Sequence, residues 1–173
     1  MPETDWTLDE MGSRIDGFLG PVIDAAGFDL GYEISEGRGA GAFIQPDITV
    51  AFTGRDTELL LAYKAELLLA LEHLTLEALK IPHDDRYRLI FDANDYRLLR
   101  IEELRMSAEV AAEKVTRSGM PFHFSPMTSR ERRVLHLALR DNHEVRTESE
   151  GTAPHRHTVI YPADPASSGR PAR

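Results

Sequence analysis

Residues 126–136 read Pro-Met-Thr-Ser-Arg-Glu-Arg-Arg-Val-Leu-His, and this stretch decides how the second half of the chain folds. Thr128 and Glu131 have the spacing of a capping box, which predicts a helix that begins here and runs through Leu139. Arg132 and His136 are four residues apart, so they would share one face of that helix. A forked guanidinium beside an ionisable imidazole suits a phosphate or a carboxylate.

The segments around this helix predict a small sheet. Residues 144–149 and 156–161 alternate in polarity and flank a turn at Glu150-Gly151, which indicates an antiparallel hairpin. Residues 120–124 are a short strand candidate. Upstream, a helix is expected from the capping residues at 92–95 to Gly119, and it would bridge two domains. Residues 163–173 are rich in Pro, Ser, Gly and Ala, which is typical of a disordered tail.

The first half has a different order of elements. Apolar residues at helical spacing predict a helix over 8–26 that stops at Gly27. Two strands, 28–35 and 43–52, are joined by the glycine-rich stretch 36–41, which is expected to form a hairpin loop. A leucine-dense helical region follows over 56–79, and Pro82 ends it before a strand at 86–91.

Composition narrows the possible functions. The chain has 173 residues and no cysteine, which excludes disulfides, thiolate metal sites and a cysteine nucleophile. Neither a membrane-spanning run of about 20 apolar residues nor a signal peptide is evident, so a soluble cytoplasmic protein without membrane contact is expected. No hydrolase or phosphate-loop motif occurs, and His155 with His157 lacks a third metal ligand. We therefore expect no catalysis, no metal and no cofactor.

Charge is divided unequally along the chain. The formal net charge is −9, which by itself argues against a nucleic-acid partner. Residues 1–91 hold 17 acidic and 7 basic side chains, a net charge of −10, whereas residues 92–173 hold 12 acidic and 13 basic ones, a net charge of +1. Twelve of those thirteen are arginines. An anion site is therefore predicted in the second half.

The second half resembles the R-three-H domain, a small α/β module named for its Arg-x-x-x-His motif and associated with single-stranded nucleic acids. More closely, it resembles the Jag (SpoIIIJ-associated) family of bacterial RNA-binding proteins, in which a KH domain precedes an R-three-H domain. The residues that carry this resemblance are Asp92, Tyr96, Arg97, Arg100, Pro126, Met127, Glu131, Arg132, Arg133, His136, Ala138, Leu139, Val145, Thr147, Ser149, Gly151, Arg156, Val159 and Ile160.

For the first half, the resemblance implies a type II KH domain, whose order is α-β-β-α-α-β. KH domains hold a nucleic-acid backbone with a Gly-x-x-Gly loop between two helices. Here Ala62-Tyr63-Lys64-Ala65 stands at that position, and alanine favours a continuing helix by roughly 1 kcal/mol over glycine. We therefore expect the KH loop to be impaired or lost, and a continuous helix at these residues would mean that it is gone.

Several basic residues are candidates for contact with phosphate, and each has a plainer interpretation. Arg132 and His136 could form ordinary surface ion pairs with Glu131 or Asp141. Of Arg130 and Arg133, one could extend the basic surface while the other is merely solvated. Arg97 and Arg100 either face the same ligand or pair with Glu103 and Asp95. Arg156, after the hairpin turn, could reach the same surface.

The sequence thus predicts an α+β protein of two domains, a KH-like domain over 1–91 and an R-three-H domain over 92–162, joined by a long helix. Its expected function is binding of single-stranded RNA, or else DNA, through the second domain. The alternative is an interaction adaptor whose acidic KH-like half docks a partner protein. The proposed nucleic-acid-binding residues are Arg132, His136, Arg133, Arg97, Arg100, Arg130 and Arg156.

Overall fold

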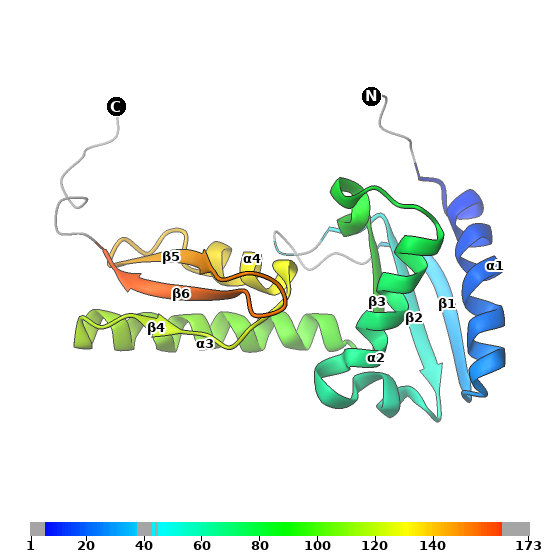
Figure 1. Cartoon of the computed structure of the whole chain (residues 1–173), viewed down its shortest axis with the longest axis horizontal. Helices are drawn as coiled ribbons and strands as arrows, with labels where there is room; N and C mark the ends of the chain where they lie inside the picture. The colour runs from blue at the N-terminus through cyan, green and yellow to red at the C-terminus, as the bar shows by residue number, and fades with distance from the viewer. Residues whose placement is uncertain (1–5, 38–42, 44, 164–173) are drawn as a thin grey trace. The chain divides into compact units, whose positions relative to one another are not determined.

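The computed structural model describes residues 6–37, 43 and 45–163 and has an α+β architecture. The chain forms two compact units that divide between Leu98 and Leu99, and each unit is described here by itself. The first contains a mixed sheet with helices and the second a small antiparallel sheet (Figure 1). In the described part of the chain, no helix is both long and apolar enough to cross a membrane.

The first unit is built on a three-stranded sheet of β1 (Leu30–Glu36), β2 (Ile48–Gly54) and β3 (Leu89–Ala93). The strand order is β1-β2-β3, with β1 antiparallel and β3 parallel to β2. Helices α1 (Leu8–Ala26) and α2 (Thr57–Ala78) pack against it (Figure 1). The Thr7 hydroxyl accepts the Glu10 N–H at the start of α1, and Gly27 ends the helix in a left-handed conformation.

Two predicted strands are partly wrong. The strand expected over 43–52 begins only at Ile48, and residues 43 and 45–47 lie outside it. Residues 86–88 lie in a 3₁₀ helix, η1 (His83–Arg88), and β3 begins only at Leu89. The Pro82 carbonyl accepts the Asp85 N–H at the start of this turn. The Arg86 and Arg88 guanidiniums bond to carboxylates of Glu77 and Asp47, so their side chains hold the turn in place. The expected hairpin loop over 36–41 lies mostly outside the described residues.

The helix that the propensity of alanine favours does not continue through Ala62–Ala65. Ala62 has an extended ψ of 153°, and Tyr63, Lys64 and Ala65 have φ values of 51°, 63° and 59°. A left-handed conformation costs a residue with a Cβ roughly 1–2 kcal/mol. Two contacts offset this cost, because the Ala65 side chain is fully buried and the Tyr96 hydroxyl donates to the Lys64 carbonyl at 3.1 Å. Packing outweighs the helix propensity of alanine here.

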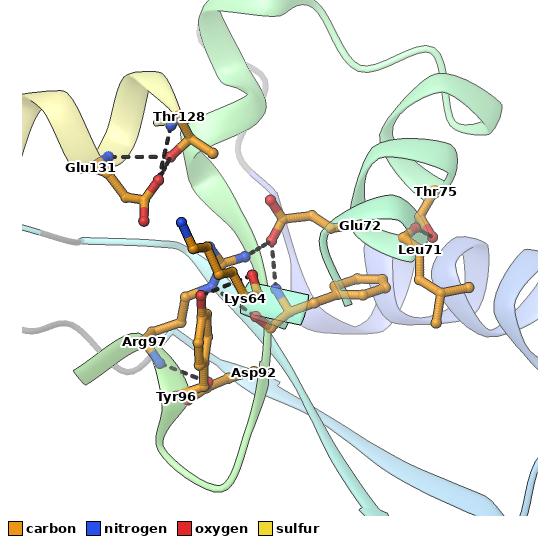
Figure 2. A network of polar contacts seen from close by, with 10 residues as sticks. Lys64, Leu71, Glu72, Thr75, Asp92, Tyr96, Arg97, Thr128 and Glu131 are labelled. Carbon is orange, nitrogen blue, oxygen red and sulfur yellow. Dashed lines mark hydrogen bonds and ion pairs between the residues drawn. The ribbon is translucent and has the colours of Figure 1, made fainter. Parts of the chain in front are cut away.

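A buried ion pair closes the open edge of β3. The Glu72 carboxylate on α2 accepts the Phe91 N–H at 2.8 Å and the Arg97 guanidinium at 2.6 Å. The Arg97 Nε donates to the Phe91 carbonyl at 3.0 Å, and the Asp92 carboxylate accepts the Arg97 backbone N–H (Figure 2). Both outward-facing backbone groups of Phe91 are thereby bonded, so this part of the edge offers no free pairing site.

The second unit contains most of α3 (Tyr96–Ser118), followed by β4 (Phe122–His123), α4 (Ser129–Ala138), β5 (Val145–Glu150) and β6 (His157–Pro162). The strand order is β4-β6-β5, and both pairings are antiparallel. Buried alanines at 108, 111 and 112 allow a close approach of α3 to its neighbours. The predicted hairpin and the Thr128–Glu131 capping box are confirmed.

The Glu72–Arg97 pair predicts a large stability effect. Replacing Glu72 with alanine leaves the Arg97 charge and the Phe91 N–H without a buried partner, so the free energy of unfolding should fall by about 3 kcal/mol. Urea unfolding measures this loss. The control is Glu77→Ala on the same helix, whose half-exposed carboxylate pairs with Arg86 and whose loss should cost less than about 1 kcal/mol. Equal effects of the two variants would contradict the structural role of Glu72.

The left-handed loop predicts a stabilising glycine. Lys64 is exposed at a φ of 63°, so Lys64→Gly should raise the free energy of unfolding by about 1 kcal/mol, because glycine adopts this conformation without steric cost. Ala70→Gly, at an exposed helical position of α2, should lower it by a similar amount. Changes of opposite sign in the free energy of unfolding, measured with urea, would establish the break in the helix. A decrease in both variants would indicate a continuous helix.

Candidate nucleic-acid interface

Arg132 lies in the second turn of α4 and is the central feature of this site. Its Nε is buried and has no hydrogen-bond partner among the described residues. Burial, and then the nearby positive charge of Arg156, lower the pKa of Arg132 below its ordinary value. The Met127 N–H donates to the Arg156 carbonyl at 3.1 Å, which holds the segment before β6 close to the start of α4. Two guanidiniums therefore lie near each other.

His136, one turn further along α4, has both ring nitrogens engaged. Its Nδ1 lies 2.6 Å from the Thr147 hydroxyl and its Nε2 lies 3.0 Å from the Ser149 hydroxyl. Thr147 and Ser149 are two residues apart on β5, so their side chains point to the same face of the sheet, the one that meets α4. The imidazole is thus held between two hydroxyls of one strand.

The protonation of His136 follows from its surroundings. Burial, and then the positive charge of Arg132, lower the pKa of His136 below 6.5. The ring is therefore neutral at pH 7, with one N–H donor and one nitrogen acceptor. The two carboxylates nearby on β5 bond elsewhere, since Glu148 pairs with Arg146 and Glu150 accepts the Tyr161 hydroxyl.

The other predicted arginines of the second unit differ in their surroundings. Arg133 and Arg156 are exposed, and neither they nor Arg132 form an ion pair with any residue that the structure describes. Arg130 is half-buried and has an interaction with another part of the protein. The unpaired positive charge around α4 therefore comes from Arg132, Arg133 and Arg156.

Arg100 has carboxylate partners on two sides. Its Nε donates to Glu131 at 2.7 Å, and a second nitrogen donates to Glu103 at 2.7 Å. Of the two interpretations given by the sequence, pairing with Glu103 is the one seen, and Glu131 is an additional partner. Burial raises the pKa of Glu131, but the hydrogen bonds from Thr128 and Arg100 outweigh it and lower the pKa overall. Arg100 thus holds the carboxylate that caps α4.

Arg97 lies in the first unit rather than with the α4 arginines. Its guanidinium bonds to Glu72 and to the Phe91 carbonyl, and its side chain is only 12% exposed. The expected alternative partner, Asp95, is not the residue it pairs with. The sequence could not distinguish these cases, because Glu72 is 25 residues away from Arg97 along the chain.

Thr147 and Ser149 belong to the candidate site, but the sequence alone did not indicate a role for their hydroxyls. They matched the closing hairpin of the resembled family, but no role followed from that match. A signal was present, because two hydroxyl side chains at alternate positions of a strand must share a face. What the sequence lacked was the pairing of that face with α4.

The aromatic residues of β4 form a shallow groove with α3. Phe122 and Phe124 are half-buried, with ring centroids 5.1 Å apart, while His123 is exposed. The groove is also lined by Met106, Val110 and Lys114. No group of three or more metal-ligating side chains occurs in the described segments.

Comparisons with known proteins agree with this geometry. The family model of the R-three-H domain matches residues 102–162, which include α4, β5 and most of α3. The "RNA-binding protein KhpB" of Clostridium symbiosum is 30% identical over 145 residues, covering 83% of this chain and 62% of the relative. The protein of the same name in Bacillus subtilis (strain 168) is 36% identical over 110 residues, covering 62% of this chain and 53% of the relative.

A third relative of that name, from Lactiplantibacillus plantarum, is 40% identical over 72 residues, which is 42% of this chain and 22% of the relative. The chain thus spans about 60% of the length of the Clostridium protein and less of the other two. The first and widest of these matches extends beyond the R-three-H region into the first unit. Residues 102–162 thus match the R-three-H domain, and the chain is similar over most of its length to a protein named KhpB.

Proposed function

We propose that this protein binds single-stranded RNA through a basic surface of its second unit, centred on Arg132. The observation that carries the proposal is the pair of neighbouring cations, Arg132 and Arg156, that have no carboxylate partner among the described residues. Two unpaired guanidiniums repel each other, so an anion placed between them removes a cost that the free protein bears. Phosphate is the anion whose geometry suits two forked donors.

RNA is favoured over other anionic partners because the relatives are named as RNA-binding proteins. A single strand is favoured because R-three-H modules are associated with unpaired nucleic acid, as the resemblance of the Arg-x-x-x-His motif implies. Arg133 is exposed on the same helix and widens the surface. The contacts are to the backbone, which positions a strand but does not select its sequence. The binding is non-catalytic.

Arg97 and Arg100 are left out of the proposed contact surface. Both are largely buried and neutralised by glutamates, and separating either from its partners would leave a carboxylate unpaired. Their role in binding is indirect: Arg100 supports α4, and Arg97 supports β3 within the other unit. The set of proposed contact residues is therefore smaller than the seven arginine and histidine residues predicted from the sequence.

For the first unit we propose a type II KH-like fold. Support comes from the order α1, β1, β2, a broken α2 and β3, in which the break at Ala62–Ala65 gives two helical segments at the position of the KH loop. The acidic balance of residues 1–91 and the absence of both loop glycines argue for a minor contribution to RNA affinity. A partner protein docked on this acidic unit remains the alternative function.

The proposed surface predicts the salt dependence of binding. Arg132→Ala and Arg156→Ala should each weaken binding of a single-stranded RNA about tenfold or more, since hydrogen bonds to charged groups contribute about 1.5–3 kcal/mol. Each should also reduce the slope of log affinity against log salt by about 0.7, the value for one lost phosphate contact on a single strand. Fluorescence anisotropy at several salt concentrations measures both quantities.

The matched control is Arg105→Ala, because Arg105 on α3 pairs with Glu102 and Glu109 and lies outside the proposed surface. Its affinity and salt slope should equal those of the parent protein. Unchanged binding by the Arg132 and Arg156 variants would remove the proposal. Pull-downs before and after nuclease treatment then test the alternative, because an adaptor keeps its protein partners once RNA is gone.

A further inference from the structure

We propose that the hydroxyls of Thr147 and Ser149 are phosphate-contacting groups of this surface and that His136 is a positioning residue that holds them in place. The inference rests on the proposed RNA-binding function and assigns the roles within that site. It changes the expected role of the Arg-x-x-x-His histidine, from a group that contacts phosphate to one that orients the groups that do.

His136 has no ring nitrogen left with which to bond a ligand. Both nitrogens already lie at hydrogen-bond distance from a hydroxyl, 2.6 Å for Thr147 and 3.0 Å for Ser149. An imidazole has only two polar atoms. A phosphate that bonded directly to His136 would have to displace one of these hydroxyls.

The number of polar hydrogens on the ring and the two hydroxyls decides how many donors remain for a ligand. A neutral imidazole and two hydroxyls carry three polar hydrogens, and the two hydrogen bonds use two of them. One hydroxyl accepts the ring N–H and keeps its own O–H free to donate. The other donates to the unprotonated nitrogen. The half-buried hydroxyl pair therefore presents one donor, whichever tautomer the ring adopts.

Protonation of His136 adds a second donor. The cationic ring donates from both nitrogens, so both hydroxyls become acceptors toward the ring and both O–H groups are free. A phosphodiester offers only acceptors, so it favours this state over the neutral one. The Arg132 guanidinium on α4 is the cation that acts on the ring, and Arg156 in turn acts on Arg132, so an anion beside these groups offsets their repulsion.

The sign of the pH effect follows from linkage. In the free protein, burial and Arg132 hold the pKa of His136 below 6.5, and bound phosphate raises it. Affinity should therefore be constant above the pKa of the complex and increase as pH falls below it, until the ring of the free protein is also protonated. Binding takes up a proton within that window.

The test uses the full chain and an oligouridine, because uracil gains no proton between about pH 5 and pH 8. Thr147→Val and Ser149→Ala should each weaken binding about fivefold at a pH where the ring of the complex is protonated and both hydroxyls donate, the effect of one lost neutral hydrogen bond. Thr147→Ser restores the hydroxyl and should restore affinity. His136→Gln retains a donor and an acceptor but cannot take up a proton, so its affinity should not change with pH.

Controls separate this inference from the proposed function. His157→Gln should keep the pH dependence of the parent protein, because the His157 ring lies against His123 and the His155 carbonyl rather than against His136. Hydroxyl variants that bind like the parent, beside an Arg132→Ala variant that binds weakly, would overturn the inference and leave RNA binding intact. If Arg132→Ala and Arg156→Ala also bind RNA like the parent protein, both the inference and the proposed function fail.

A measurement on the unsubstituted protein tests the inference even if the variants fail to fold. NMR titration of the His136 ring, with and without oligouridine, reports its pKa in each state. The expected result is a higher pKa in the complex, with the Nδ1 and Nε2 hydrogen bonds both retained. An unchanged or lower pKa on binding would overturn the inference.

Discussion

The candidate site depends on one carboxylate, that of Glu131. One of its oxygens accepts the Thr128 backbone N–H and hydroxyl, at 2.9 Å and 3.0 Å, and the other accepts the Arg100 Nε at 2.7 Å. The hydrogen bonds from Thr128 fix where α4 begins, and the hydrogen bond from Arg100 holds that end of α4 against α3. Because Arg132 follows Glu131 directly, the position of the guanidinium is set by the same contacts that start the helix. A side chain with no role in binding thus determines where the binding side chain lies.

Positive charge in the second half is mostly used within the protein. Arg100, Arg105 and Arg146 each pair with one or two glutamates. Around α4, the arginines that keep no carboxylate partner among the described residues are Arg132, Arg133 and Arg156. A net charge of +1 over residues 92–173 therefore describes the surface poorly, because it counts paired and unpaired arginines alike. What matters for an anionic ligand is which cations lack a partner, and that follows from tertiary contacts.

The sequence predicted those parts of the structure that local signals encode. The capping box and the hairpin each depend on residues within a few positions of one another, and both are found. Helix propensity favoured a continuing helix at Ala62–Ala65 because it is a local quantity, whereas a buried methyl group and a distant tyrosine decide the backbone there. The bonding of His136 to β5 was missed for the same reason. Eleven and thirteen residues separate it from its two hydroxyl partners.

The left-handed turn at residues 63–65 has a consequence for order in the free protein. A loop with glycines samples many backbone conformations and loses that freedom when something binds to it. Tyr63, Lys64 and Ala65 have far fewer accessible states, and here they are confined to one of them by packing and by the Tyr96 hydroxyl. The chain has therefore already borne the loss of conformational entropy during folding. Any molecule that meets this loop encounters a fixed shape, in which Tyr63 is 89% exposed.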